Sequence, residues 1–572
     1  MITGAQLFVK ALNEENVDTL FAYPGGQIID LLDELYNDNS INMILPRHEQ
    51  GLAHAADGYA RSSGKPGVCL VTSGPGATNL VTAIATANYD AVPLVCFTGQ
   101  VVTSLIGKDA FQEADIVGMV KSVTKFAITV RNREELGAII RKAFVIAQSG
   151  KPGSVLVDIP KDIQQQLGSE EYPIDIQRRD TLPTLEQQNK QINKAIESLQ
   201  SAKRPLLLAG GGVKISKAER ELSKFVELTG IPVVTTIMGK GAIPSDSPLF
   251  YGNVGIHGSF GANTAVDKCD LLLSVGVRFN DRIAGSKENF AKHAKIIHID
   301  IDPSTVSRNI LADIPILGDA KKVLSLLTEN AKPLKLSAWI KDLDELKSAY
   351  PVKIANDKLN PQMIIEKLNT LFDDIIVATD VGQNQLWTTQ FLKLNESRRL
   401  LTSGGFGTMG FGLPAAIGAK LANPKTPVVA IVGDGGFQMN VQELATAVIN
   451  GLPIIICLLN NCWLGNVRQW QELYYGKRYQ STCLRRRATC PTRCVTMQEC
   501  PAYVPNFQKL ADSYEVKYRR VTSKEEIDEA FAFAMQQTEY PTLLEFMIDE
   551  EENVYPIILP GKDLSTVKFS KE

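Results

Sequence analysis

The fold of this chain is decided by the stretch Val428 to Asn461, which reads VVAIVGDGGFQMNVQELATAVINGLPIIICLLNN. Its apolar, β-branched beginning, Val428–Val432, predicts a buried parallel strand, and Ile454–Leu459 predicts a second one. A strand–helix–strand unit of this length closes as a right-handed crossover. The two strands are therefore parallel, and both end at the carboxyl edge of one sheet, where open α/β sheets bind their ligands.

The segment between these strands predicts a helix. Asn440, with Glu443 three residues later, has the spacing of a capping box that starts the helix. Gly451-Leu452-Pro453 ends it before the second strand begins.

Two oxygen donors follow these strands, Asp434 after the first and Asn461 after the second. A carboxylate and an amide carbonyl suit Mg²⁺, which completes its shell with phosphate oxygens. Gly435 and Gly436 allow backbone N–H groups to approach a diphosphate. GDG followed at this distance by NN resembles the diphosphate-binding motif of the thiamin diphosphate enzymes, which implies Mg²⁺ ligands at Asp434, Asn461 and the Trp463 carbonyl.

Length and composition exclude several classes of protein. The 572 residues predict about three or four domains, and 44% apolar and 22% charged residues with a net charge of −3 suggest no nucleic-acid partner. The apolar runs are too short to span a bilayer. An amphipathic helix at Gln6–Asn16 takes the place of a signal or transit peptide, so we expect a cytoplasmic protein without a membrane partner.

Short apolar strands alternate with amphipathic helices along most of the chain. This pattern predicts an α/β fold of three doubly wound parallel-sheet domains, at residues 1–165, 190–345 and 361–550. The polar stretches 161–190 and 332–360 are expected to be linkers. In the first domain we expect strands at Met43–Leu45, Val68–Thr72 and Val92–Thr98, with glycine-rich loops at strand ends.

Glu49 is the candidate catalytic residue of the first domain. It follows a predicted strand and precedes the small-residue helix Gly51–Ala60, although a lone Glu at a helix start is often only a solvated cap. The segment Arg47-His48-Glu49 resembles the pyrimidine-binding segment of the thiamin diphosphate enzymes. In that family the matching Glu bonds the aminopyrimidine ring and promotes loss of the cofactor's C2 proton, work that suits a carboxylate in a dry site. We expect His48 to be structural.

The second domain has three strands that end in candidate ligand-binding loops. Pro205–Ala209 leads into Gly210-Gly211-Gly212, Leu271–Val275 into Gly276 to Arg282, and Ile296–Ile301 into Asp302-Pro303. These loops are typical of a nucleotide site, although no GxGxxG fingerprint is present.

Taken together, the motifs resemble the catalytic subunits of the acetohydroxyacid synthase (acetolactate synthase) family, within the thiamin diphosphate-dependent enzymes, over nearly the whole chain. The residues that carry this resemblance are Tyr23 to Gly26, Arg47-His48-Glu49, Ser73 to Asn79, Asp109 to Glu113, Asp158 to Asp162, Arg278 to Arg282, Gly407 to Gly412, Leu464-Gly465 and Val467 to Trp470. The Phe-x-Asp-Arg loop, together with Arg-Gln-Trp, narrows the match to this family.

The resemblance implies a role for each matching residue. It implies catalytic or channel positions at Glu49, Gln112, Lys161 and Met409, with Met409 as the apolar wedge that bends the cofactor. It implies thiamin diphosphate contacts at Gly26, Pro75, Asn79, Gln383, Asn384, Met409, Gly435 and Gly436, and FAD contacts at Gly210, Gly211, Gly212, Arg278, Asp300 and Asp319. Arg282 and Trp470 resemble the pair that recognises the second 2-ketoacid. Two alternative interpretations compete with these roles. Met409 would be an ordinary core residue, and Arg282 and Lys161 would be surface charges.

The implied activity is decarboxylation of pyruvate and transfer of the two-carbon unit to pyruvate or 2-ketobutyrate, giving 2-acetolactate or 2-aceto-2-hydroxybutyrate for branched-chain amino acid biosynthesis. The implied assembly is a homodimer or homotetramer with active sites between subunits, Glu49 coming from one and Asp434 from the other. A small regulatory subunit is a further partner that the resemblance implies. Another carboligase or decarboxylase of 2-ketoacids, or a non-catalytic paralogue, are the alternatives. Asn466, Val102 and Ile256 depart from the family, as does Asn384, where His is usual.

Four of the nine cysteines, Cys483, Cys490, Cys494 and Cys500, fall within 18 residues that also hold several arginines. Three interpretations remain open for this insertion. It is a surface segment with reduced thiols, a small zinc or iron–sulfur site, or a redox-switched disulfide whose thiolates the arginines favour.

Overall fold

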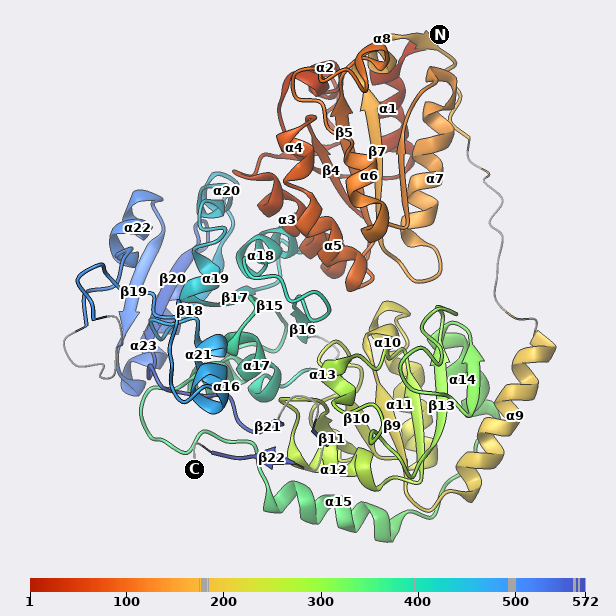
Figure 1. Cartoon of the computed structure of the whole chain (residues 1–572), viewed down its shortest axis with the longest axis vertical. Coiled ribbons are helices and arrows are strands. Elements are labelled where there is room, and N and C mark those ends of the chain that lie inside the picture. The colour runs from red at the N-terminus through yellow and green to blue at the C-terminus, as the bar shows by residue number, and fades with distance from the viewer. Residues whose placement is uncertain are drawn as a thin grey trace.

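The computed structural model describes the chain apart from residues 174, 176–182, 184, 396–397, 492–499, 559–561, 564–565 and 571–572, and the side chains of residues 185–187 and 398. It contains three six-stranded parallel sheets, each covered by helices, which confirms the predicted fold class. In Figure 1 the N-terminal domain lies at the top, the C-terminal domain at the left and the middle domain at the lower right.

The N-terminal domain forms around the buried apolar strands that the sequence predicts. Its sheet has the order β3-β2-β4-β5-β7-β6. The strands are β2 (Thr19–Tyr23), β3 (Asn42–Ile44), β4 (Gly67–Val71), β5 (Leu94–Gln100), β6 (Phe126–Thr129) and β7 (Ser154–Pro160). The helices are α1 (Gly4–Glu14), α2 (Ile29–Tyr36), α3 (Glu49–Ser63), α4 (Pro75–Thr78), α5 (Val81–Tyr89), α6 (Ile116–Val120), α7 (Leu136–Gln148) and α8 (Lys161–Gln165).

The middle domain has a different order, β11-β10-β9-β12-β13-β14, which in chain order is the 3-2-1-4-5-6 arrangement of dinucleotide-binding domains. Its strands are β9 (Pro205–Ala209), β10 (Val233–Thr235), β11 (Phe250–Asn253), β12 (Leu271–Val275), β13 (Lys295–Asp300) and β14 (Ile314–Leu317). Its helices are α9 (Leu185–Ser201), α10 (Gly211–Ile215), α11 (Glu219–Thr229), α12 (Phe260–Lys268), α13 (Asp281–Ala284), α14 (Ala320–Asn330) and α15 (Ser337–Ala349). The glycine loop after β9 therefore lies at the point where the strand order reverses.

The C-terminal sheet, β16-β15-β17-β18-β20-β19, repeats the strand order of the N-terminal sheet. Its strands are β15 (Ile375–Thr379), β16 (Arg398–Leu401), β17 (Val428–Gly433), β18 (Ile454–Asn460), β19 (Lys517–Val521) and β20 (Thr542–Met547). Its helices are α16 (Pro361–Leu371), α17 (Gln383–Phe391), α18 (Gly412–Ala422), α19 (Asp434–Phe437), α20 (Glu443–Ile449), α21 (Gly465–Tyr474), α22 (Phe507–Ser513) and α23 (Ile527–Met535). β17 and β18 pair in parallel, as predicted.

The predicted capping box is wrong. Helix α20, which leads into β18, begins at Glu443, with Gln442 at its N-cap and no side-chain cap. Asn440 instead donates its amide to the Gly410 carbonyl at 2.6 Å. The Glu443 carboxylate is bound by backbone N–H groups of the N-terminal domain, so neither side chain is available to cap this helix.

The expected linkers contain regular structure. Within 161–190, β8 (Leu167–Gly168) pairs with β1 (Ile2–Thr3), and α9 begins at Leu185. Within 332–360, α15 places Trp339 and Leu343 in the core of the middle domain, so its apolar face outweighs its polar composition. Near the end of the chain, β21 (Ile557–Ile558) and β22 (Val567–Lys568) lie beside the middle domain (Figure 1), where Ile558 donates to the Ile256 carbonyl at 2.8 Å.

Helices α3 and α18 join the N- and C-terminal domains through close backbone contact. A Cβ atom on Gly418 would lie 1.8 Å from the Ala55 carbonyl oxygen, and one on Gly58 would lie 2.2 Å from that of Ala415. Only glycine allows this approach, and the alanines around it keep the helices close along their length. Among the described residues, no helix is both long and apolar enough to cross a bilayer.

Candidate active site

The predicted metal ligands lie at the carboxyl ends of neighbouring strands in the C-terminal sheet. Asp434 follows β17 and Asn461 follows β18, so the parallel pairing brings them to one edge. The Asn461 amide donates to Gln383 Oε1 at 3.1 Å, and its Oδ1 accepts the Trp463 N–H at 3.1 Å. These two bonds fix the orientation of the amide, so that Oδ1 faces away from Gln383 and retains one free lone pair.

Asp434 is 1% exposed, and its Oδ2 has no hydrogen-bond partner among the described residues. Burial raises the pKa of its carboxyl to about 7. A buried carboxylate oxygen without a partner is unfavourable unless a cation or a proton neutralises it. One carboxylate, one amide oxygen and a backbone carbonyl form a donor set that fits Mg²⁺, because this ion takes few protein ligands and keeps oxygen donors.

The residues predicted to contact the diphosphate lie around this edge. Gln383 and Asn384 begin α17, and Asn384 Oδ1 is also buried with no hydrogen-bond partner in the described part of the chain. A Cβ atom on Gly436 would lie 2.2 Å from Asp380 Oδ1, so this glycine is required by the tight packing beside the site. A Cβ atom on Gly435 would lie 2.4 Å from Leu464 Cδ2 and 3.7 Å from Met409 Cε, so this glycine lies beside Met409.

Two residues at this edge, Asp380 and Tyr503, were not predicted from the sequence as site residues. Asp380 follows β15 and accepts N–H groups from Val381, Gly410 and Gly412, and burial raises its pKa to about 6. Its position directly after an apolar strand is the same signal that identified Asp434 and could have revealed it. The Tyr503 hydroxyl hydrogen-bonds the Asp434 carboxyl. No local pattern connects residues so far apart in the sequence.

The loop that carries Met409 is fixed on both sides of that residue. On one side, Gly410 donates to both oxygens of Asp380 at 3.0 Å. On the other, Thr408 donates its N–H to Ser403 Oγ at 3.1 Å, and its hydroxyl lies 2.6 Å from that of Thr86 in the N-terminal domain. Met409 therefore lies at a constrained point of the loop.

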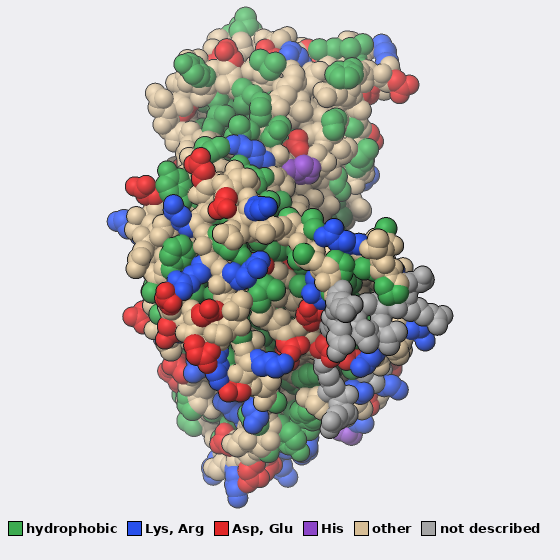
Figure 2. Space-filling model, turned by 90° about the vertical axis from the view of Figure 1, so that its left-hand side faces the viewer, with side chains coloured by type: hydrophobic (Ala, Val, Ile, Leu, Met, Phe, Trp, Pro, Cys, Tyr) green, Lys and Arg blue, Asp and Glu red, His purple; other side chains and the backbone are tan. Residues whose placement is uncertain are grey.

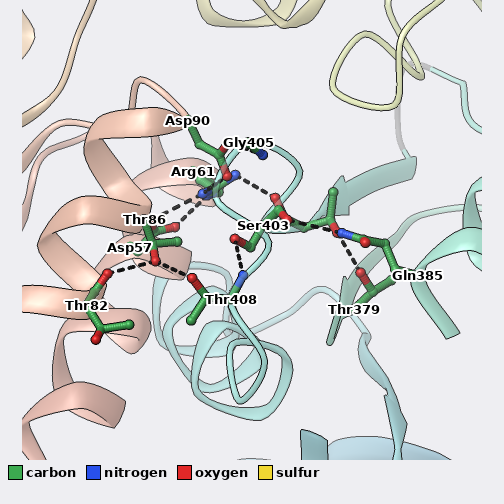
Figure 3. Close-up of polar contacts among 11 residues, drawn as sticks. Asp57, Arg61, Thr82, Thr86, Asp90, Thr379, Gln385, Ser403, Gly405 and Thr408 are labelled. Carbon is green, nitrogen blue, oxygen red and sulfur yellow. Dashed lines mark hydrogen bonds and ion pairs between the residues drawn. The ribbon is translucent and has the colours of Figure 1, made fainter. Parts of the chain in front are cut away.

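A buried ion-pair network from the N-terminal domain holds the beginning of the same loop (Figure 3). Arg61 bonds Asp57 and Asp90, whose side chains are fully buried, and donates to the Thr402 carbonyl at 2.9 Å. Asp90 in turn accepts the Gly405 N–H at 2.7 Å. The position of Met409 thus depends on both domains.

Glu49 is the first residue of α3 and is 9% exposed. Asn79 donates to Glu49 Oε2 at 2.9 Å, which leaves Oε1 without a hydrogen-bond partner among the described residues. The His48 ring nitrogen Nδ1 accepts the Gln50 N–H at 3.1 Å as the N-cap, in line with its expected structural role. Glu49 is therefore more than a solvated cap, because it is buried and oriented by a second side chain.

The other N-terminal candidates follow the ends of sheet strands, on loops or at the beginning of short helices. Lys161, the first residue of α8 directly after β7, donates to the Gly26 carbonyl at 2.9 Å. Pro75 begins α4. Gln112 adopts a positive φ of 58° and lies against Gly74, where a Cβ atom would be 2.7 Å from the Gln112 carbonyl oxygen. Because of its bond to the Gly26 carbonyl, Lys161 is not a fully exposed surface charge.

A cavity of about 2460 Å³ lies where the three domains meet. Gly211, Gly212, Arg278, Asp300 and Asp319 line it, together with Thr402 to Gly407 of the Met409 loop. Gly210 lies beside Gly276, whose carbonyl oxygen would be 2.1 Å from a Cβ atom at position 210, so the two switch-point strand ends touch. Burial raises the pKa of Asp300 to about 6, whereas Asp319 caps α14 and accepts the Ser216 hydroxyl at 2.7 Å.

The structure brings the two predicted substrate residues together at the cavity wall. The Arg282 guanidinium carbon lies 5.9 Å from the centre of the Trp470 ring, although the two residues belong to different domains. The Arg282 side chain is 62% exposed and so keeps donors free. Asn466 and Ile256, two departures from the family, line the same cavity.

The cysteine-rich insertion begins beside the loop that holds the predicted metal ligand Trp463. Cys483 pairs with Trp463 as an isolated β-bridge, and Arg485 forms an ion pair with Glu550 at 2.6 Å. Cys494 lies outside the described residues. The part of the chain that is described contains no group of three or more His, Cys, Asp or Glu side chains able to hold a metal ion. The three interpretations of this insertion therefore stay open.

Comparison with known protein families agrees with this geometry. Residues 2–119, 192–327 and 380–546 match the N-terminal TPP binding domain, the central domain and the C-terminal TPP binding domain of thiamine pyrophosphate enzymes, thiamine pyrophosphate being thiamin diphosphate. The chain belongs to the thiamine pyrophosphate enzyme family and is a thiamin diphosphate-dependent enzyme.

Similarity to individual proteins narrows the family further. The chain is 45% identical to a probable acetolactate synthase large subunit of Methanococcus aeolicus, over 99% of this chain and 95% of the relative. It is 42% identical to the acetolactate synthase large subunit of Corynebacterium glutamicum, over 100% and 90%. It is 41% identical to that of Porphyra purpurea, over 98% and 94%. The chain is thus a homologue of acetolactate synthase large subunits over its whole length.

Proposed function

We propose that this chain is the catalytic subunit of an acetolactate synthase. It would decarboxylate pyruvate and transfer the two-carbon unit to a second pyruvate or to 2-ketobutyrate, giving 2-acetolactate or 2-aceto-2-hydroxybutyrate for branched-chain amino acid biosynthesis. The observation that carries this proposal is the Arg282–Trp470 pair on the cavity wall. A guanidinium binds a ketoacid carboxylate, and an indole bounds a pocket for its alkyl group.

The residues at the two sheet edges divide the remaining work. When bound, thiamin diphosphate supplies the nucleophilic carbon and the electron sink of the reaction. Asp434, Asn461 and the Trp463 carbonyl would hold Mg²⁺, while Gln383, Asn384, Gly435 and Gly436 would surround the diphosphate. Glu49, oriented by Asn79, would hold a proton at Oε1 against the pyrimidine ring, and Met409 would set the bend between the two rings.

FAD is proposed for the cavity of the middle domain. The 3-2-1-4-5-6 strand order and the contact between Gly210 and Gly276 support a dinucleotide at the switch point. The purified protein should be yellow, with a flavin spectrum that pyruvate does not bleach in step with turnover. A colourless preparation that is fully active without added FAD would remove the flavin from the proposal.

A homodimer is the proposed minimum assembly, with Glu49 of one subunit facing Asp434 of the other. Large hydrophobic side chains are exposed in both cofactor domains, including Phe111 at 85%, Ile449 at 68% and Met439 at 50%. Such side chains support a surface for a partner. On the face in Figure 2, hydrophobic and uncharged side chains dominate the N-terminal domain at the top, whereas charges of both signs intermingle below it. Because the relatives are named large subunits, we also propose a small regulatory partner.

One assay separates this function from its alternatives. The protein is incubated with pyruvate, thiamin diphosphate and Mg²⁺, and acetolactate is measured as acetoin after acid treatment. Acetolactate supports the synthase, acetaldehyde alone would indicate a decarboxylase, and no turnover would indicate a non-catalytic paralogue. Replacing Arg282 by Lys should raise the KM for the second ketoacid, because a lysine cannot bind a carboxylate with two parallel hydrogen bonds.

A further inference from the structure

Glu443 is a buried acidic residue that the proposed mechanism does not use. It begins α20 in the C-terminal domain and is 1% exposed. Its side chain crosses to the N-terminal domain, where Oε1 and Oε2 both accept the Arg47 N–H at 3.1 Å and Oε1 also accepts the His48 N–H at 3.1 Å. Oε2 accepts the Thr446 hydroxyl at 2.6 Å.

The two N–H groups belong to the residues immediately before Glu49. His48 has extended backbone dihedrals and α3 starts at the next residue, so the bonds to Glu443 fix the point at which the chain enters the helix. Side-chain direction at a first helical residue follows from this backbone, and Asn79 then orients the carboxylate. A residue of the C-terminal domain thus fixes the backbone that positions Glu49.

Gly51 shows how closely the Glu443 side chain fits. A Cβ atom on Gly51 would lie 2.4 Å from Glu443 Oε1 and 2.9 Å from its Cγ. Any side chain at position 51 would therefore push the Glu443 carboxylate away from the Arg47 and His48 N–H groups. The contact is also independent of local sequence, because it joins residues that are 396 and 395 positions apart.

We propose that Glu443 is a positioning residue that sets the place of Glu49 from across the domain boundary. This inference rests on the proposed role of Glu49 in the removal of the cofactor's C2 proton. Glu443 acts through the backbone of Arg47 and His48 and does not itself touch the cofactor. A misplacement of about 1 Å in a catalytic group costs on the order of 10²-fold in rate, so the loss of these bonds should be visible in the proton-transfer step.

Three variants test the proposal against a matched control. Glu443→Ala removes every acceptor, whereas Glu443→Gln keeps one carbonyl oxygen at the place of Oε1 and should rescue the function. Gly51→Ala displaces the carboxylate without removing it. Glu15→Ala is the control, because Glu15 is also a largely buried carboxylate. It lies in the N-terminal domain, is bonded to Arg141 and Tyr172, and is remote in sequence from α3.

The first readout needs no cofactor. Backbone amide hydrogen exchange of residues 42–50 is measured in the apo protein by mass spectrometry. Exchange at this segment should be about 10-fold or more faster in Glu443→Ala and Gly51→Ala than in the wild type, and unchanged in Glu443→Gln and Glu15→Ala. Unchanged protection in both Glu443→Ala and Gly51→Ala would overturn the proposal.

The second readout is the rate at which the C2 proton of bound thiamin diphosphate exchanges with deuterium, measured after an acid quench. We expect Glu443→Ala and Gly51→Ala to lower it about 10–100-fold, with the cofactor concentration for half saturation changed less than about threefold. Glu443→Gln should stay within about threefold of wild type. If Glu443→Ala does not fold, Gly51→Ala carries the test, and normal exchange in that variant would refute the positioning role.

Glu49→Gln, measured in parallel, separates the two levels of the argument. If it exchanges the C2 proton as fast as wild type, the proposed function of Glu49 is wrong. If it is slow while Glu443→Ala is normal, the role of Glu49 stands and the inference about Glu443 fails. If Glu15→Ala slows exchange as much as Glu443→Ala, the effect is one of general stability, and the inference fails as well.

Discussion

Arg61 offers the sharpest test of how the two cofactor domains are held together. Its guanidinium lies between the Asp57 and Asp90 carboxylates, both with fully buried side chains, and bonds Asp90 at 3.0 Å. In Arg61→Met two buried carboxylates would remain without a cation. Removing one partner from a buried ion pair costs about 3–5 kcal/mol of stability. For a domain of the size of the N-terminal domain, this loss of stability corresponds to a fall in Tm of roughly 10 °C.

The assay is thermal unfolding of the apo protein, followed by circular dichroism at several pH values. Burial raises the pKa of Asp57, and Arg61 opposes this rise, so the variant should have a pKa higher still. A carboxyl whose folded pKa exceeds its unfolded value stabilises the folded state as the pH falls. The deficit of Arg61→Met should therefore shrink in mildly acidic buffer. The control is Lys341→Met, which breaks an ion pair whose side chains are 77% and 68% exposed. Equal shifts for the two variants at neutral pH would refute the reasoning.

Four further outcomes are expected. Asp434→Ala should raise the Mg²⁺–thiamin diphosphate concentration needed for half-maximal activity, because a site with so few protein ligands has no spare donor; an unchanged saturation curve defeats the metal assignment. Burial raises the pKa of Asp380 to about 6, so its buried charge lowers the wild-type Tm as the pH rises from about 4 to about 6. Asp380→Asn should flatten that part of the Tm–pH curve, and an identical slope would show that another group titrates. Asn466 Oδ1 is buried without a partner among the described residues, so Asn466→Met should shift kcat/KM toward 2-ketobutyrate over pyruvate by up to about 10-fold. Direct competition between the two ketoacids measures this shift, and an unchanged product ratio would place Asn466 outside the specificity pocket. Elemental analysis of anaerobically purified wild type and Cys490→Ser/Cys494→Ser should decide whether the insertion holds zinc or iron. If the wild type contains less than about a tenth of an equivalent of either metal, and oxidants do not change its kinetics, the insertion is a surface segment with reduced thiols.

The sequence contained most of the fold because buried parallel strands leave an unmistakable local signal. Leu271–Val275 and Pro205–Ala209 are strands with the predicted bounds, and β17 extends the predicted Val428–Val432 by one residue. Such runs of β-branched and apolar residues end abruptly at glycine or aspartate, and the spacing of these ends determines which loops meet. The location of Asp434 and Asn461 at one sheet edge followed from this pattern alone.

What the sequence did not reveal depends on partners far along the chain. Asn440 and Glu443 have capping-box spacing, yet both side chains bind other segments, Gly410 and the start of α3. The helix α15 was hidden by its polar composition, because only its Trp339 and Leu343 face is buried. Tyr503 reaches Asp434 from a distant loop. In each case tertiary contacts override a local preference, and no window of neighbouring residues records them.

The contact between α3 and α18 also determines how this protein can move. Where Gly58 and Gly418 bring one backbone against another, no side-chain layer exists that could slide or rearrange. The N- and C-terminal domains should therefore behave as a single rigid body on the millisecond timescale. Any opening that admits substrate or releases product must then come from displacement of the middle domain across the large cavity, or from loops at its rim. Time-resolved distance measurements between labels on the domains would show a constant N–C separation and a fluctuating separation to the middle domain.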